Sequence, residues 1–208
     1  MKLLNTYLGT PNGQIGKTFV FFVWKGIKCA RSWVIPSNPQ SFGQTAQREK
    51  FTIIMEVGRG LLSSVIQKFW KKFAIQMSEF NAFMSSNLNA MTSKTDWQHF
   101  LISKGHLQPT VISDATYDAA TGEVIINWDG TVINNQLASD KFVGVIVDTQ
   151  YRSCWIIDSG TLRSAQTQLM DTMPGLTFSY LRCYSFFYRD LGLSTELIGD
   201  SAYSLVGE

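Results

Sequence analysis

The sequence predicts an α+β fold, in which an N-terminal β-hairpin and several helices precede a C-terminal β-sandwich. Helical periodicity is confined to the first half of the chain, and short alternating segments recur in the second half. The charge also changes sign, since residues 1–108 carry 13 Lys and Arg against 4 Asp and Glu, and residues 109–208 carry 5 against 12. We therefore predict a basic hairpin-plus-helices domain over 1–108 and an acidic sandwich domain over 109–208.

The first half is predicted to start with a β-hairpin. Phe19 to Trp24 is a run of aromatic and β-branched residues, which favour strands, and Lys25-Gly26 supplies a turn into an alternating segment over 27–35. Apolar residues at helical spacing then predict three helices, over 42–57, 61–73 and 78–91, with an interruption at Gly58-Arg59-Gly60. A short return strand is predicted over 100–103.

The second half has the pattern of a β-sandwich of about 100 residues. Turn dipeptides such as Thr-Gly, Asp-Gly and Pro-Gly separate short segments that alternate between apolar and polar residues. Seven strands are predicted, over 111–117, 123–128, 142–148, 154–158, 165–169, 176–187 and 202–206.

Details of this half resemble a fibronectin type III module, an immunoglobulin-like fold. Trp128 ends the second predicted strand, where such modules place a core tryptophan, and Met173-Pro174-Gly175-Leu176-Thr177-Phe178 resembles their Leu-Pro-Gly-Thr-x-Tyr motif. Phe178 stands in place of the tyrosine whose hydroxyl normally bonds to the backbone, so Tyr180 or Tyr184 is the expected substitute. The resemblance implies an architecture and no particular function.

Tests for catalytic motifs give no positive result. Gly16-Lys17-Thr18 resembles the end of a phosphate-binding loop, but Pro11 replaces the required first glycine and a strand follows instead of a helix. His99 and His106 have no nearby cluster of carboxylates or cysteines, so they make a poor zinc site, which needs four ligands or three plus water. Most aspartates adjoin predicted turns, which aspartate caps, and Cys183 has no histidine in its own half to activate it. We expect no enzyme activity, no cofactor and no metal; a small hydrolase is the weaker alternative.

The sequence gives no sign of export or membrane insertion. Its longest apolar run, Phe19 to Trp24, is far shorter than the roughly 20 residues that a membrane span needs. Polar residues interrupt the first ten positions, so no secretion signal is predicted. Cys29, Cys154 and Cys183 are odd in number and apolar in context, which favours free, buried thiols in a reducing compartment.

The basic residues of the first half are candidate contacts for nucleic acid or for an acidic partner. They are interleaved with aromatic residues such as Phe22, Trp24 and Trp70, as in surfaces that bind single strands. The alternative is that the aromatics form the core and the cations a solvated rim. The candidate contacts are Lys17, Lys25, Lys28, Arg31, Arg48, Lys68, Lys71 and Lys72.

Several short motifs resemble an uncharacterised family of about 200 residues that occurs in Bacteroides-type bacteria and their phages. They are Gly13-Gln14-Ile15-Gly16-Lys17, Trp24-Lys25-Gly26-Ile27, Arg31, Asn38-Pro39, the stretch from Gln44 to Phe51, Ser103 to Leu107 and Gly199 to Tyr203. The Trp-Lys-Gly and Gln-x-x-Gln-Arg-x-x-Phe motifs are the most specific. We expect Gly16, Trp24, Gly26, Gln44, Arg48 and Phe51 to define the fold.

The leading functional hypothesis is a structural protein of a bacteriophage particle, associated with its capsid or tail. Its expected partners are other virion proteins or copies of itself, in an oligomer, because the two halves carry opposite charge. The expected location is the virion, assembled in the bacterial cytoplasm, without membrane contact. The alternative is a nucleic-acid-binding protein that uses the basic half and acts in the bacterial cytoplasm.

Overall fold

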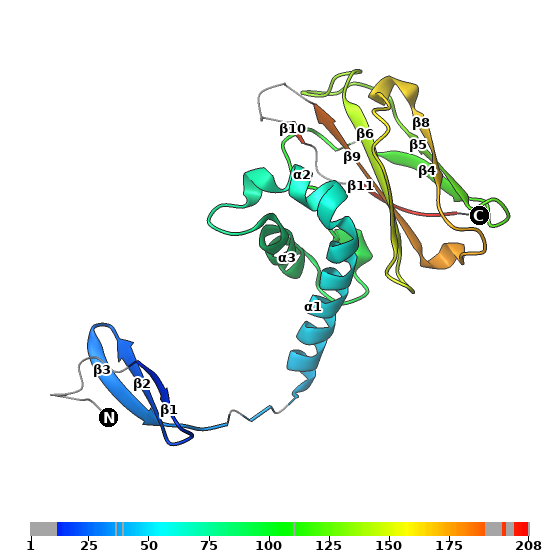
Figure 1. Cartoon of the computed structure of the whole chain (residues 1–208). Helices are drawn as coiled ribbons and strands as arrows, with labels where there is room; N and C mark the ends of the chain where they lie inside the picture. Colours follow the sequence, from blue (N-terminus) through cyan, green and yellow to red (C-terminus); the bar gives the residue numbers. More distant parts are fainter. Residues whose placement is uncertain are drawn as a thin grey trace. The chain divides into compact units, whose positions relative to one another are not determined.

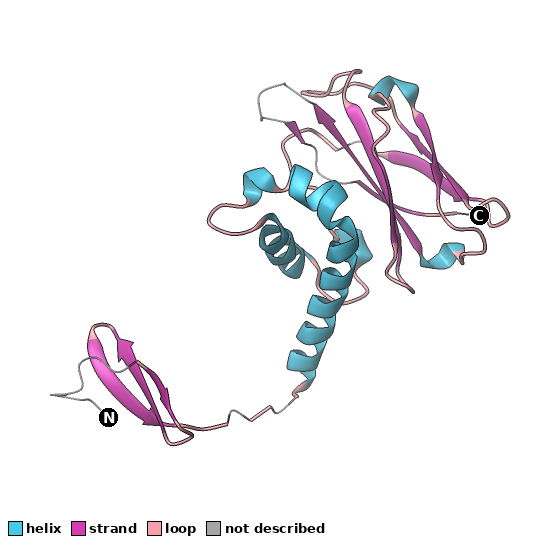
Figure 2. Cartoon of the chain, viewed as in Figure 1, coloured by secondary structure: helices cyan, strands magenta, loops and turns pink. Residues whose placement is uncertain are grey.

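Contacts in the computed structural model divide the chain into two units, Met1–Ser41 and Phe42–Glu208. The structure describes residues 12–35, 37–38, 40–109, 111–189, 197–198 and 202–207. Figure 1 shows the elements of each unit, and Figure 2 shows that the larger one combines helices with strands. The chain is therefore a mixed helix and sheet protein.

The first unit is a three-stranded antiparallel sheet in the order β1-β2-β3. Strands β2 (Phe19–Trp24) and β3 (Ile27–Ser32) confirm the predicted hairpin, although β3 ends three residues before the predicted end at Ile35. Strand β1 (Gly13–Ile15) was not predicted and pairs with β2. Tight turns join the strands, and Gly16 and Gly26 occupy them with positive φ angles of 55° and 79°.

The second unit begins with a helical layer. Helix α1 (Phe42–Leu61) continues into a π-helical turn (Leu62–Ile66), helix α2 (Gln67–Phe69) and a 3₁₀ turn (Lys71–Phe73). Helix α3 (Glu79–Ala90) follows, with Ser78 accepting a hydrogen bond from the Asn81 amide as N-cap, and a 3₁₀ turn (Trp97–His99) ends the layer.

The predicted helix break at Gly58-Arg59-Gly60 is wrong, because α1 runs through these residues. A Cβ on Gly58 would lie 2.9 Å from Phe83 Cε1 and 3.1 Å from Phe80 Cε2. The glycine therefore lets α3 approach closely and does not end the helix.

The predicted strand over 100–103 is also absent from the described residues, because side chains bond to its backbone groups. The Asn87 side chain donates to Leu101 O and accepts from Leu101 N, and Trp70 Nε1 donates to Ile102 O.

The predicted strands of the second half are all present, with shifted ends. They are β4 (Ile112–Tyr117), β5 (Glu123–Trp128), β6 (Lys141–Asp148), β7 (Cys154–Ile157), β8 (Thr167–Asp171), β9 (Leu181–Arg189) and β11 (Ala202–Leu205). A two-residue strand, β10 (Leu197–Ile198), is additional. They form two sheets: β4-β5-β8, and β10-β9-β6-β7 with β11 also paired to β9.

The five-stranded sheet has an apolar core on each of its faces. Val143, Val145 and Val147 of β6 belong to the core that contains the helices, while Phe142 and Ile146 belong to the core that contains β4, β5 and β8. Alternate residues of a strand point to opposite faces, so β6 is apolar almost throughout instead of alternating. The order of layers is thus helices, five-stranded sheet, three-stranded sheet.

Because the helices and the five-stranded sheet share a core, the boundary between the two units does not lie near Pro109, where the sequence predicted the domain boundary. Phe69 of α2 lies edge-on to Phe186 of β9, with ring centroids 4.9 Å apart. The helices after Phe42 therefore belong with the larger unit's sheets, and the described strands of the smaller unit are β1–β3. The change of charge sign near residue 108 does not coincide with a change of core.

The turn before β9 is held by a residue that the fibronectin comparison did not indicate. Tyr117 Oη donates to Met173 O at 2.8 Å and accepts from Leu176 N at 2.9 Å. Tyr184 and Tyr180 were the tyrosines expected to hold this turn. The Tyr184 hydroxyl donates instead to Trp97 O in the helical layer, and the Tyr180 hydroxyl makes no hydrogen bond within the described part of the chain. The tyrosine that fixes this turn therefore comes from β4.

Candidate functional site

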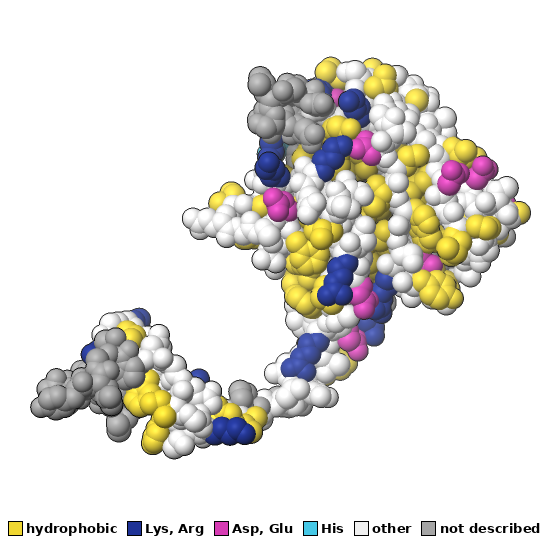
Figure 3. Space-filling model, in the orientation of Figure 1, with side chains coloured by type: hydrophobic (Ala, Val, Ile, Leu, Met, Phe, Trp, Pro, Cys, Tyr) yellow, Lys and Arg dark blue, Asp and Glu magenta, His cyan; other side chains and the backbone are white. Residues whose placement is uncertain are grey.

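The sheet of β1–β3 exposes an unusual amount of apolar surface for its size. Ala30, at 6% exposure, is the one buried residue among residues 12–35, whereas Trp24 is 59% exposed and Ile15, Phe19 and Val23 are also exposed. Residues 1–41 contain five Lys and Arg and no Asp or Glu. Figure 3 shows hydrophobic and basic side chains together on this sheet. Exposed apolar patches of this kind mark interaction sites.

Four of the predicted contact residues lie on this sheet. Lys17 and Lys25 occupy its two tight turns, and Lys28 and Arg31 lie on β3. Lys25 Nζ lies 5.2 Å from the Trp24 ring centroid, and the Arg31 guanidinium carbon lies 6.0 Å from that of Phe22. Cations and aromatic rings are therefore presented together, as the sequence predicted.

The other four predicted contact residues belong to the larger unit and do not form one basic patch. Lys68 Nζ forms an ion pair with Asp158 at 2.5 Å and lies 4.9 Å from the Tyr188 ring centroid. Burial lowers the pKa of Lys68, but Asp158 and Tyr188 more than offset this effect, so its pKa is raised overall. Lys71 and Lys72 are exposed in the 3₁₀ turn, and Arg48 is exposed on α1.

The Gln-x-x-Gln-Arg-x-x-Phe motif lies on the exposed first turns of α1. Gln44, Gln47, Arg48 and Phe51 line one open hollow of about 730 Å³, and Phe51 is 46% exposed. Buried residues of α1 begin only at Lys50, whose Nζ donates to Leu88 O and Met91 O. The motif is therefore placed to contact something outside the core, in addition to any role in the fold.

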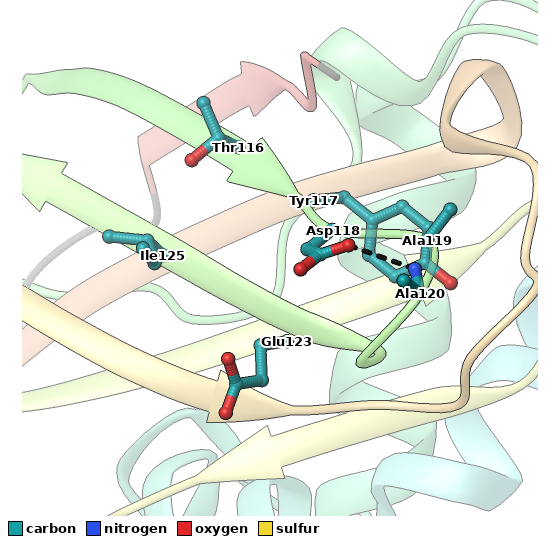
Figure 4. A pocket seen from close by; sticks show the side chains of 7 residues that line it. All are labelled: Thr116, Tyr117, Asp118, Ala119, Ala120, Glu123 and Ile125. Atoms are coloured by element: carbon teal, nitrogen blue, oxygen red, sulfur yellow. Dashed lines mark hydrogen bonds between the residues drawn. The ribbon is translucent and has the colours of Figure 1, made fainter.

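An acidic surface lies on the outer face of the sheet β4-β5-β8. The register pairs Glu123 with Asp171 and Ile125 with Leu169, and Ile125 is 42% exposed. These strands contain no Lys or Arg, and within the described residues none of their carboxylates has an ion-pair partner. Thr116, Glu123 and Ile125 are among the residues that line a hollow of about 550 Å³ on this sheet, and their side chains are drawn in Figure 4.

The sequence predicted an acidic second half but not this surface, because most of its aspartates adjoin predicted turns and were interpreted as turn formers. Alternation in Glu123–Trp128 was the available signal: Val124, Ile126 and Trp128 point inward, which places Glu123 and Ile125 outward. An outward-facing isoleucine next to an outward-facing glutamate on a predicted strand indicates an outer face with its own contact chemistry.

A buried ion cluster lies at one end of the larger unit. Asp140 lies 2.7 Å from Arg189 Nη2 and 3.6 Å from Arg163 Nη2, and the side chains of Asp140 and Arg163 are fully buried. Burial lowers the pKa of Arg163, and the charge of Asp140 partly restores it. The Arg163 guanidinium also lies 3.9 Å from the Phe187 ring centroid. The cluster joins the segment before β6, the 3₁₀ turn at Arg163–Ala165 and the end of β9.

Several predicted turn aspartates have the expected structural role. Asp118, Asp129 and Asp148 each accept a hydrogen bond from a backbone N–H two residues later. His99 lies 2.7 Å from Asp96, which also accepts from the Thr92 amide. Within the described part of the chain, no three His, Cys, Asp or Glu side chains group as metal ligands.

The three cysteines are free thiols. Cys183 is buried, as predicted, whereas Cys29 and Cys154 are only partly buried. Burial raises the pKa of Cys154 to about 12 and raises that of Cys183 as well, so both are protonated at neutral pH. None of the described helices is both long and apolar enough to cross a membrane.

Comparison with known families matches residues 11–187 to a family of unknown function, DUF6266. The chain belongs to this family. The prediction of an uncharacterised family is thereby confirmed. No curated protein matches the chain.

The DUF6266 match includes the three exposed regions described above. It extends over the sheet of β1–β3, the exposed start of α1 and all three strands of the acidic sheet. Of the motifs quoted for the family resemblance, Pro39 and Gly199 to Ser201 lie outside the described residues.

Proposed function

We propose that this chain is a non-catalytic structural protein that works by contact with neighbouring proteins or with copies of itself. The observation that carries the proposal is the sheet of β1–β3, which exposes aromatic and aliphatic side chains and buries one described residue. A protein that acts alone rarely leaves such a patch in water. The exposed motif on α1 supports a second contact region.

The proposed setting is a bacteriophage particle, in its capsid or tail. This setting is supported by the resemblance of the Trp-Lys-Gly and Gln-x-x-Gln-Arg-x-x-Phe motifs to a family found in Bacteroides-type bacteria and their phages. Mass spectrometry of purified particles tests it. We expect peptides of this chain in stoichiometric amounts, and their absence would contradict the particle setting.

We further propose that the sheets of the larger unit form an immunoglobulin-like sandwich of the fibronectin type III kind. The orders β4-β5-β8 and β7-β6-β9-β11 resemble A-B-E and C′-C-F-G of that fold. Trp128, stacked on Phe142 with centroids 4.3 Å apart, lies in the core between the sheets.

Nucleic-acid binding is the second candidate function, and it is favoured by the cation–aromatic pairs on the small sheet. Binding of a fluorescent single-stranded oligonucleotide would then weaken steeply with salt. Lys25→Glu with Arg31→Glu would abolish it, whereas Lys71→Glu with Lys72→Glu would have a smaller effect. No binding at low salt would exclude this function.

A further inference from the structure

One face of the β1–β3 sheet combines apolar and cationic side chains. The register pairs Val20 with Arg31 and Trp24 with Ile27, and residues paired across an antiparallel ladder lie on the same face. Phe22 lies between them on β2, and Lys25 reaches over Trp24 from the turn. We call this set the cationic face: Val20, Phe22, Trp24, Lys25, Ile27 and Arg31.

The composition of the cationic face defines what can cover it. Its aromatic and aliphatic centre needs an apolar counterpart, because leaving this area in water forfeits its burial free energy. Its arginine and lysine need carboxylates or phosphates, and residues 1–41 supply no acidic side chain. A flat protein surface with an apolar centre and acidic flanks meets both requirements.

The outer surface of β4-β5-β8 has this complementary composition. Ile125 and Leu169 form an exposed apolar pair, and Glu123 and Asp171 form the next pair along the same two strands. Asp114 of β4 lies on the same side, paired with Asn127. Like charges directly opposite each other destabilise a sheet, so the pair of Glu123 and Asp171 favours an incoming cation. We call this set the acidic face: Asp114, Glu123, Ile125, Leu169 and Asp171.

We propose that the cationic face of one molecule packs on the acidic face of a second copy. This inference rests on the proposed contact function and specifies its partner. Arginine and lysine of one copy would meet Glu123 and Asp171 of the next, with Trp24 and Phe22 over Ile125 and Leu169. Because the two faces differ, the contact is heterologous. In a pair, each molecule still has one free face, so further copies can add and form open chains or rings.

The size of the faces sets the strength of a single contact. The β1–β3 sheet has strands of three, six and six residues, and the β4-β5-β8 sheet has strands of six, six and five, so each face covers at most roughly 14 by 20 Å at standard strand spacing. Such a face is smaller than the ~800 Å² per partner of a standard interface. We therefore expect weak, concentration-dependent association that salt reduces, and stable assembly only where many contacts act together.

Sedimentation velocity of the full chain and of charge-reversed variants tests the pairing. Lys25→Glu with Arg31→Glu reverses the cationic face, and Glu123→Lys with Asp171→Lys reverses the acidic face. Each double variant should weaken association by about tenfold or more, because like charges then meet across the interface. The variant with all four changes has the net charge of the natural chain and should associate as the natural chain does.

Lys71→Glu with Lys72→Glu is the matched control, since it changes net charge as the Lys25 and Arg31 variant does but lies elsewhere. It should leave association unchanged. Thermal unfolding of each variant reports whether it folds, and Gln in place of each reversed charge supplies a milder set. A natural chain that stays monomeric at all concentrations, or a fourfold variant as weak as the doubles, would overturn the inference.

Other partners of the cationic face would give different results in these experiments. A monomeric chain whose cationic face binds an oligonucleotide would assign that face to nucleic acid and remove the second copy as its partner. A monomeric chain found in purified particles would also overturn the pairing of copies, but it would leave the proposed structural function in place with a different neighbouring protein.

Discussion

Asp140 is the residue on which the end of the larger unit depends most. Its carboxylate contacts Arg189 and Arg163 and accepts a hydrogen bond from the Leu137 amide at 2.8 Å. Two arginines converge on one buried acid, so its removal takes the carboxylate away from the fully buried cation of Arg163. Asp140→Asn should lower the free energy of unfolding by about 3–5 kcal/mol, measured by guanidinium denaturation.

Asp158→Asn is the matched control for that change. It also removes a carboxylate from a cation, but Lys68 and Asp158 are partly exposed and water screens their attraction. We expect a loss of less than about 1 kcal/mol. Equal losses for the two variants would contradict the role given to burial.

Asp96 makes the stability of the helical layer depend on pH. Hydrogen bonds from the Thr92 amide and hydroxyl, together with His99, hold the pKa of Asp96 well below its usual range. The unfolded chain therefore binds a proton near pH 4 that the folded chain does not bind. The contribution of Asp96 is fully present above pH ~4 and is lost as the pH falls toward its folded-state pKa.

Unfolding in denaturant at pH 3 and at pH 6 checks this effect. The natural chain should lose more stability between these values than Asp96→Asn, which has no carboxyl to protonate at this position. An identical pH dependence in both chains would show that Asp96 is not coupled to folding.

At the scale of elements, local patterns predicted most of the strands and failed where packing overrides propensity. The hairpin and the seven strands were predicted because their residue types and alternation are local properties. The continuous helix through Gly58 was not predicted, since it depends on how closely Phe83 of α3 approaches. No neighbouring residue in the sequence carries that information.

Gly58 and Gly60 of α1 provide an opposed pair of predictions. Gly58→Ala should destabilise the chain by about 1–3 kcal/mol, because a Cβ there would press into the buried ring of Phe83. Gly60→Ala should stabilise it by up to about 1 kcal/mol, since its Cβ would meet Cys154 at an ordinary 3.5 Å and helix propensity improves. Thermal unfolding of both variants measures the difference, and a stabilising Gly58→Ala would refute the close-packing explanation.

At the scale of the whole molecule, the distribution of charge along the sequence predicted the basic surface of the small sheet but did not indicate the acidic face of β4-β5-β8. Cations of the small sheet lie beside aromatic rings, as their interleaving in the sequence indicated, and their role as contact residues stays a prediction. The acidic face was not identified, because Glu123 and Asp171 are 48 residues apart and only strand pairing brings them together. The unit boundary was likewise beyond local patterns, since helices and sheets share a core through contacts distant in the sequence.

The central claim is that the exposed sheet of β1–β3 is a contact surface between molecules. Sedimentation velocity over a wide concentration range, on the full chain and on Trp24→Ser with Ile27→Ser, tests it most directly. We predict concentration-dependent oligomers for the natural chain and a monomer for the double variant, with the unfolding transition of the larger unit unchanged. A natural chain that is monomeric throughout, or a double variant that associates equally well, would contradict the claim.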